Sequence, residues 1–194
     1  MNFFVVDFEF TQYRKHIGRP RGFFSEIIEI GAVKVCGQTN EIVGNIHNFV
    51  KPHFYPKQAK EIMEFCSITE ADMKTAITFA EMLDKITELY IPNETYYVMW
   101  GTQDYSVIET GCERHNLTNP ILQSDCLDLA KAYKEMHGDN YTTGLRAAIE
   151  ENDITTEGHW HAAYDDAHKT GLLLIKLLQD GWTPKEFLEQ KEMN

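Results

Sequence analysis

The amino-acid sequence predicts an α/β protein in which helices flank a mixed sheet. Two features of the chain support this fold class. Three strand-like segments come first, and helix-like segments then alternate with short apolar strands. This order is typical of a mixed sheet and argues against an all-parallel one.

The first predicted strand, residues 3–11, is rich in aromatic and branched side chains and is apolar on both faces. These properties indicate a buried central strand rather than an edge strand. The next two strands, joined by a turn near residues 37–40, would form an antiparallel meander. These two strands are expected at residues 26–35 and 41–50. A fourth and a fifth strand are expected later in the chain, at residues 96–100 and 121–126.

The clearest helix signal is the capping box Thr78-x-x-Glu81, which predicts a helix over residues 79–90. A long helix is expected to stop at Gly181, because glycine commonly follows a helix C-terminus. The other helices are expected at residues 104–115, 127–136, 143–151 and 165–180, with a short terminal helix from Thr183.

Length and composition are those of one globular domain spanning residues 1–194. Hydrophobic residues make up 43% of the chain and charged residues 25%, and no Pro/Gly/Ser-rich stretch marks a linker. No apolar run approaches the roughly 18 residues that a membrane span needs, and the N-terminus lacks the features of a signal peptide. The four cysteines are scattered, which favours reduced thiols over a disulfide frame or a zinc site. We therefore expect a cytoplasmic protein with no membrane partner.

The formal net charge of −12 argues against a protein that coats duplex nucleic acid through a broad basic face. A site that uses metal ions to meet phosphate is still compatible with an acidic surface.

Asp7 and Glu9 lie two residues apart in the first predicted strand. Strand side chains repeat with period two at about 3.3 Å per residue, so both carboxylates point to one side, roughly 6.6 Å apart along the backbone. Burying two anions together is costly unless a cation neutralises them, and the segment has no Lys or Arg. A bound cation is therefore the favoured interpretation. The alternative is a strand that ends at Asp7 and leaves Glu9 in solvent.

Asp104 follows the strand predicted at residues 96–100. Alone it would be an ordinary acidic residue in the first turn of a helix. Its position at the carboxyl end of a strand, however, is where open α/β sheets place ligand-binding residues.

Asp165 and Asp166 begin the helix predicted at residues 165–180. Helical spacing places Asp165 in one row with Lys169, so we expect Asp165 to face solvent and to pair with Lys169. Asp166 heads the apolar row that faces the core, and His161 precedes it by five residues on a loop. An inward carboxylate at a helix start with a nearby histidine indicates a functional site.

His159 is expected to have a structural role. The alternative is a transition-metal pair, His159-x-His161, although no further His or Cys ligand lies nearby in the sequence.

The set Asp7-x-Glu9, Asp104 and His161-x4-Asp166 resembles the DEDDh 3′–5′ exonucleases, the DnaQ-like group. Residues 26–33 are similar to the second strand that those enzymes share, and segments 65–73 and 144–148 are similar to the RNA-trimming branch related to histone-mRNA and small-RNA exonucleases. The resemblance covers nearly the whole chain. It implies an RNase H-like (exonuclease) fold, with a five-stranded mixed sheet flanked by helices.

The resemblance also implies phosphodiester hydrolysis with two metal ions, Mg²⁺ or Mn²⁺. Asp7 would bridge the ions, Glu9 and Asp166 would hold the ion that activates water, and Asp104 would support the second ion. His161 would be the general base, a role that suits histidine, whose ordinary pKa is about 6.5.

The implied partner is the 3′ end of a single-stranded nucleic acid, with RNA favoured over DNA, and the implied product is a nucleoside 5′-monophosphate. The residues expected to bind the terminal nucleotide are Glu9, Phe10, Thr11 and His161. The Phe10 side chain would either stack on the base or pack in the core.

Residues 12–22 form a long basic segment that departs from the family pattern. It holds four of the 18 Lys and Arg residues and no acid: Arg14, Lys15, Arg19 and Arg21. Because the segment leaves the strand that carries Asp7 and Glu9, we expect it to guide the upstream part of the substrate strand. The alternative is a solvated loop whose charges only aid solubility.

Three other functions stay open from the sequence alone. A DNA 3′–5′ proofreading-type exonuclease would share all five site residues but usually needs a polymerase-binding tail. A catalytically silent regulatory or binding module could keep the same fold, although all five positions are occupied here. A metal-dependent phosphohydrolase of small molecules is the third.

Overall fold

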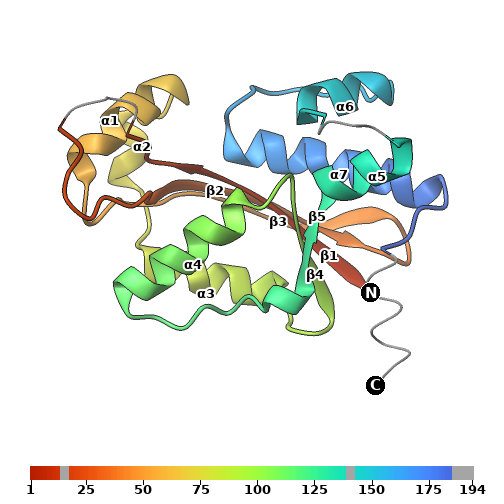
Figure 1. Cartoon of the computed structure of the whole chain (residues 1–194), viewed down its shortest axis with the longest axis horizontal. Helices are drawn as coiled ribbons and strands as arrows, with labels where there is room; N and C mark the ends of the chain where they lie inside the picture. Colours follow the sequence, from red (N-terminus) through yellow and green to blue (C-terminus); the bar gives the residue numbers. More distant parts are fainter. Residues whose placement is uncertain (14–17, 139–142, 185–194) are drawn as a thin grey trace.

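A five-stranded mixed sheet forms the centre of the protein, in a computed structural model that describes residues 1–13, 18–138 and 143–184 (Figure 1). The strands lie in the order β3-β2-β1-β4-β5. β1, β2 and β3 pair antiparallel, whereas β4 and β5 run parallel to β1. The predicted fold class is therefore confirmed. The strand bounds are β1 Asn2–Phe10, β2 Ile27–Cys36, β3 Glu41–Phe49, β4 Thr95–Met99 and β5 Cys126–Asp128.

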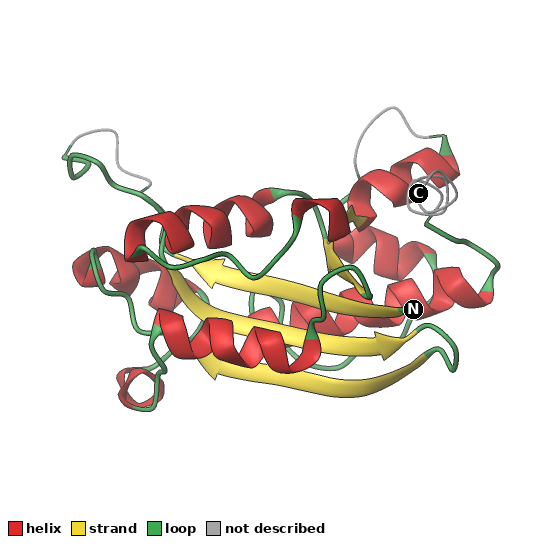
Figure 2. Cartoon of the chain, turned by 90° about the horizontal axis from the view of Figure 1, so that it is seen from below, coloured by secondary structure: helices red, strands yellow, loops and turns green. Residues whose placement is uncertain are grey.

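Helices cover both faces of the sheet (Figure 2). α3 and α4 pack on one face, and α5, α6 and α7 pack on the other. The helices of the described chain are α1 Pro56–Phe65, α2 Glu70–Lys74, α3 Phe79–Leu89, α4 Gln103–His115, α5 Leu129–His137, α6 Leu145–Glu151 and α7 Ala163–Gln179, and a 3₁₀ turn, η1 Gln123–Asp125, precedes β5.

The central strand β1 alternates between these two layers. Phe4 and Val6 pack with α3 and α4, whereas Phe3 and Val5 pack with α5, α6 and α7. The same alternation continues along the strand past Val5. It turns the acidic residues Asp7 and Glu9 toward the layer that contains α7.

α7 crosses β2 at very short range. A Cβ atom on Gly31 would lie 2.1 Å from the carbonyl carbon of Ala163, and one on Gly171 would lie 2.7 Å from a methyl group of Val33. Because interiors are close-packed, a side chain at either position would push the helix away from the sheet. Gly31 pairs directly with Asp7 in the β1–β2 ladder, so the closest approach of α7 lies beside the acidic part of β1.

α1 and α2 fill the connection between β3 and α3, and neither helix was predicted from the sequence. α1 begins at Pro56, a residue well suited to a first helical turn, and buries Ala59 and Ile62. α2 is only five residues long, and its N-terminus is closed by a reciprocal capping box between Thr69 and Asp72.

The carboxylate of Glu26, just before β2, anchors the entry to α1. Its oxygens accept hydrogen bonds from the backbone N–H groups of His53, Phe54 and Tyr55 at 2.6, 2.9 and 2.6 Å. Negative charge is favourable at a helix N-terminus. Glu26 therefore ties β2 to α1, whose far end lies beside β1.

The other predicted elements lie within two residues of observed ones, with one exception. The segment 121–126 was expected to be a strand, and it is instead η1 followed by β5. The physical reason is Asp125, whose buried carboxylate accepts from the Tyr90 hydroxyl and the Asn93 N–H and so holds a turn there. The terminal helix predicted from Thr183 lies largely outside the described residues. None of the helices in the described ranges is long and apolar enough to cross a membrane.

Candidate active site

Asp104 reaches the central strand because β4 stops short. The β1–β4 ladder ends at the pair of Val5 and Val98, which leaves later β1 amides open on this side. The Phe8 N–H donates to Asp104 Oδ1 at 3.0 Å. Asp104 is 7% exposed in the first turn of α4. The carboxylate of the acid predicted at the end of the fourth strand is therefore bonded to the central strand of the sheet.

Asp7, Glu9 and Asp104 form an acidic group along the carboxyl half of β1. Burial raises the pKa of Asp7 well above its ordinary value, and the charges of Asp104, Glu9 and Asp166 raise it further. Burial raises the pKa of Glu9 to about 7, although the Cys66 thiol donates to Glu9 Oε2 at 3.1 Å and opposes the rise. The pKa of Asp104 is also raised by burial, to about 7. Among the described residues, no Lys or Arg forms an ion pair with any of these three carboxylates.

A tight turn ahead of α7 presents His161. Its φ is +63°, in the left-handed region that is costly for a residue with a Cβ atom. The His161 N–H donates to Asp166 Oδ2 at 3.0 Å, which helps to hold this conformation. The exposed imidazole lies 4.7 Å, centre to centre, from the ring of Phe65 at the end of α1.

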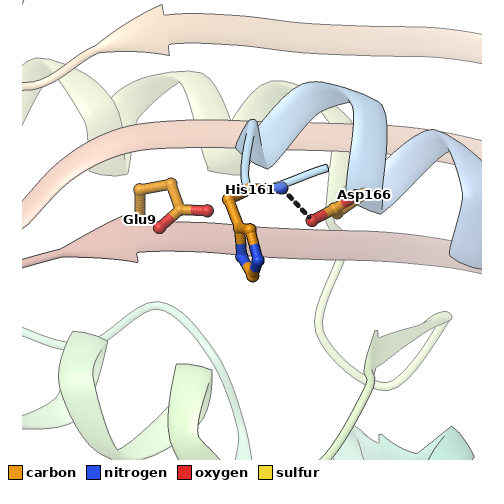
Figure 3. Close-up of side chains that lie close together, drawn as sticks. All are labelled: Glu9, His161 and Asp166. Atoms are coloured by element: carbon orange, nitrogen blue, oxygen red, sulfur yellow. Dashed lines mark hydrogen bonds between the residues drawn. The ribbon is translucent and has the colours of Figure 1, made fainter. Parts of the chain in front are cut away.

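Glu9, His161 and Asp166 converge from β1 and the start of α7 (Figure 3). One potential metal-ligand atom from each of the three lies within 4.8 Å of the others. His161 stands between the two carboxylates in this view. Asp7 lies on β1, and Asp104, in the first turn of α4, bonds to the same stretch of β1 through the Phe8 N–H. The five residues predicted for the site are thus brought together from segments up to about 150 residues apart.

The predicted orientation of Lys169 was wrong. Lys169 is 1% exposed, and Nζ donates to Asp166 Oδ1 at 3.2 Å and to the carbonyl oxygen of His159 at 2.7 Å. Helical spacing had predicted an outward-facing lysine paired with Asp165. The turn ahead of α7 folds over this side of the helix, and Lys169 lies 4.3 Å from the centre of the Trp160 ring. The ion pair is therefore with Asp166.

Asp165 was predicted to face solvent and is instead half-buried. Its Oδ2 accepts from the His159 N–H at 2.6 Å. The same turn explains this difference, because it places backbone groups above the first residues of α7. In the described chain the group of candidate metal ligands contains His161 and not His159, and the contacts of His159 agree with a structural role.

Glu29 lies beside the acidic group, and it was not predicted from the sequence as a site residue. It pairs with Glu9 across β1 and β2 and is 3% exposed. Its carboxylate lies 2.9 Å from His47 Nε2 and accepts from the Ala163 N–H, while Oε2 is buried with no hydrogen-bond partner among the described residues. Burial raises its pKa. Glu29 became recognisable only once the strand register placed it opposite Glu9.

Phe10 and Thr11 were predicted to contact the terminal nucleotide. The Phe10 side chain is 8% exposed and packs in the core, which was one of the two interpretations given for it. The Thr11 side chain is fully buried, and its Oγ1 accepts from the Glu26 N–H at 2.9 Å. A nucleotide contact by either residue stays a prediction.

The basic segment is described only in part, because residues 14–17 lie outside the described ranges. Arg19 is exposed and places its guanidinium 5.3 Å from the centre of the Phe23 ring. Its Nη2 donates to the Phe23 carbonyl oxygen at 3.3 Å. Arg21 is also exposed.

An RNase H-like mixed sheet, with four carboxylates and a histidine gathered beside its central strand, defines a nuclease of the DEDDh class. The model of the RNase_T family, described as exonuclease, matches residues 4–174. The chain belongs to this family and is a 3′–5′ exonuclease.

The similar proteins are consistent in their names. The chain is 32% identical over 186 residues to "Probable 3'-5' exonuclease KapD" of Bacillus subtilis (strain 168). The aligned region covers 96% of this chain and 87% of the relative. It is 27% identical to ERI1 exoribonuclease 2 of Mus musculus over 91% of this chain, but it spans only 28% of that relative. The solved nuclease domain of 3'hExo, a DEDDh family member bound to rAMP, has a TM-score of 0.80 at 24% identity, with 93% and 92% of the two chains covered. This last likeness confirms the fold.

Proposed function

We propose that the chain removes nucleoside 5′-monophosphates one at a time from the 3′ ends of single-stranded RNA. The observation that carries the proposal is the convergence of Asp7, Glu9, Asp104 and Asp166 beside an exposed His161. RNA as the substrate is supported by the names of relatives, several of which are exoribonucleases. The exposed Arg19 and Arg21 would help to guide the upstream strand.

The donor set fits hard divalent cations. Carboxylate oxygens are the ligands that Mg²⁺ and Mn²⁺ prefer, and the raised pKa values of Asp7, Glu9 and Asp104 show anions in need of positive charge. Asp7, Glu9, Asp104 and Asp166 would hold two such ions. When bound, the ions would activate water and stabilise charge on the scissile phosphate.

His161 would act as the general base and accept the proton of the attacking water at an imidazole nitrogen. The left-handed backbone and the hydrogen bond to Asp166 orient the ring toward the carboxylates. The Phe65 ring bounds the imidazole on one side and would limit access of bulk water. Glu29 would help to hold His161 and Asp166 in place, because its carboxylate accepts from the Ala163 N–H at the start of α7.

The proposal is tested with 5′-end-labelled single-stranded RNA, single-stranded DNA and duplexes, each with Mg²⁺, Mn²⁺ or EDTA. We expect a ladder of RNA products that shortens from the 3′ end, release of 5′-monophosphates, and no reaction in EDTA. The Asp104→Asn variant is the matched control, since it keeps an oxygen for the Phe8 N–H but removes a carboxylate. Undiminished activity in EDTA or in this variant would contradict the metal-dependent mechanism.

The same assay separates the remaining alternatives. Faster degradation of DNA than of RNA would indicate a DNA exonuclease. Cleavage of free dinucleotides without cleavage of longer strands would indicate an enzyme of small substrates.

A further inference from the structure

The buried ammonium group of Lys169 is the feature of the site that the proposed mechanism does not use. It lies 3.2 Å from Asp166 Oδ1, a carboxylate oxygen assigned to metal binding. Lysine is rarely buried this completely unless it is paired. Its second hydrogen bond, 2.7 Å to the His159 carbonyl, is also shorter than its bond to Asp166.

Lys169 ties together the two parts of the His161-x4-Asp166 motif. One bond reaches the turn that carries His161, and the other reaches the helix residue Asp166. The Trp160 ring covers the ammonium at 4.3 Å, which adds a cation–π contact. Asp166 is thereby fixed at both oxygens, because Oδ2 accepts from the His161 N–H.

Lys169 also changes the charge of the ligand set. Among the described residues it is the one Lys or Arg that forms an ion pair with any of the four carboxylates proposed to hold the metal ions. The positive charge offsets one of the negative charges that would attract a divalent cation to Glu9 and Asp166. Coulomb repulsion between an ammonium and a divalent cation is strong where both are shielded from water.

We propose that Lys169 is a positioning residue with a second, electrostatic effect. It holds the His161 turn in its working position, and its charge weakens divalent-ion binding at the Glu9–Asp166 side. An ion would then bind firmly only when the phosphates of a substrate supply further negative charge. This inference rests on the proposed metal-dependent function.

The two effects predict changes of opposite sign in one variant. Lys169→Met keeps the length and the contact with Trp160 but removes the charge and both hydrogen bonds. We expect calorimetry with Mn²⁺ and no substrate to show binding at least about tenfold tighter than in the wild type. With saturating Mn²⁺ and a short single-stranded RNA, we expect kcat to fall by about tenfold to a hundredfold with KM nearly unchanged.

Three further variants make the test specific. Lys169→Arg keeps the charge and is expected to keep the Mn²⁺ affinity of the wild type. Lys169→Gln is neutral but can still donate to His159, and it is expected to bind Mn²⁺ more tightly even if Lys169→Met does not fold. Lys176→Met removes an exposed lysine from the same helix, where it pairs with Asp180, and should change neither measurement.

A purely structural clamp would give the opposite result in calorimetry, because a loosened Asp166 would bind Mn²⁺ more weakly. Unchanged or weaker Mn²⁺ binding in both neutral variants therefore overturns the inference while the proposed function stands. Failure of the wild type to bind Mn²⁺ at all, together with activity in EDTA, overturns the proposed metal-dependent function itself.

Discussion

Replacing Asp104 by Asn should stabilise the metal-free protein while it abolishes activity. Asn keeps an oxygen in place to accept from the Phe8 N–H, so the link between α4 and β1 survives. The change removes one anion from a site where burial raises the pKa of Asp104 from 3.8 to about 7. The charge that would serve metal binding in the proposed mechanism therefore destabilises the fold when no metal is bound.

The size of the effect follows from this shift in pKa. One pKa unit corresponds to about 1.4 kcal/mol, so an isolated group with this shift would cost about 4 kcal/mol when ionised. Repulsion is shared with Asp7, and we therefore expect a gain of about 2–4 kcal/mol at pH 8. In a chain of this length that gain corresponds to a rise in Tm of roughly 5–15 °C.

The pH dependence has a definite sign. The folded-state pKa lies above the ordinary value, so the wild type has its full stability below about pH 4 and loses it as the pH rises through about 7. Thermal unfolding in EDTA should therefore show similar Tm values for both proteins at pH 4 and a higher Tm for the variant at pH 8. Mn²⁺ should stabilise the wild type more than the variant and so reduce the difference in Tm between the two proteins at pH 8.

Asp84→Asn, at an exposed position of α3, is the control and should leave Tm unchanged. Equal Tm values for wild type and Asp104→Asn at pH 8 in EDTA would refute the view of Asp104 as an uncompensated anion. A gap of the same size at pH 4 and pH 8 would show that the gain has another cause than charge.

Three other predictions concern the surroundings of the site. His161→Asn should lower kcat by about two to four orders of magnitude with Mn²⁺ affinity unchanged in calorimetry, and loss of Mn²⁺ binding would instead make His161 a ligand. Asp165→Ala should lower kcat by about tenfold, because the His159 N–H loses its acceptor; wild-type activity would show that Lys169 holds the turn alone. Glu26→Gln should reduce the free energy of unfolding in urea by about 2–3 kcal/mol without changing Mn²⁺ affinity, since one of the two oxygens that bind backbone N–H groups is lost; unchanged stability would contradict its anchoring role.

The sequence was sufficient to predict the acidic group because its geometry follows from local rules. Strand periodicity alone places Asp7 and Glu9 on one face, and chain order places Asp104 at the end of a neighbouring strand. The capping box at Thr78 and Glu81 is equally local, and it is present at the start of α3 as predicted.

Features that depend on tertiary contacts could not be predicted from local sequence patterns. Lys169 occupies a row that a lone helix would expose, and only the turn above α7 makes that row internal. Glu29 needed the strand register to be seen as a neighbour of Glu9. α1 and α2 are short, and their positions depend on packing against Ile28 and on the Glu26 carboxylate rather than on a strong periodic pattern.

Gly31 shows that the activity of this enzyme depends partly on a residue outside the set proposed for catalysis. The missing side chain lets α7 pack on β2 directly opposite Asp7, so the single hydrogen atom of this glycine sets the distance between the Asp7-x-Glu9 pair and the His161-x4-Asp166 segment. A natural variant with any larger residue at this position would keep all five side chains proposed for catalysis and still lose their alignment. A survey of genomes that counts only the acids and the histidine would score such a chain as active, and inspection of this one glycine would separate disabled copies from working ones.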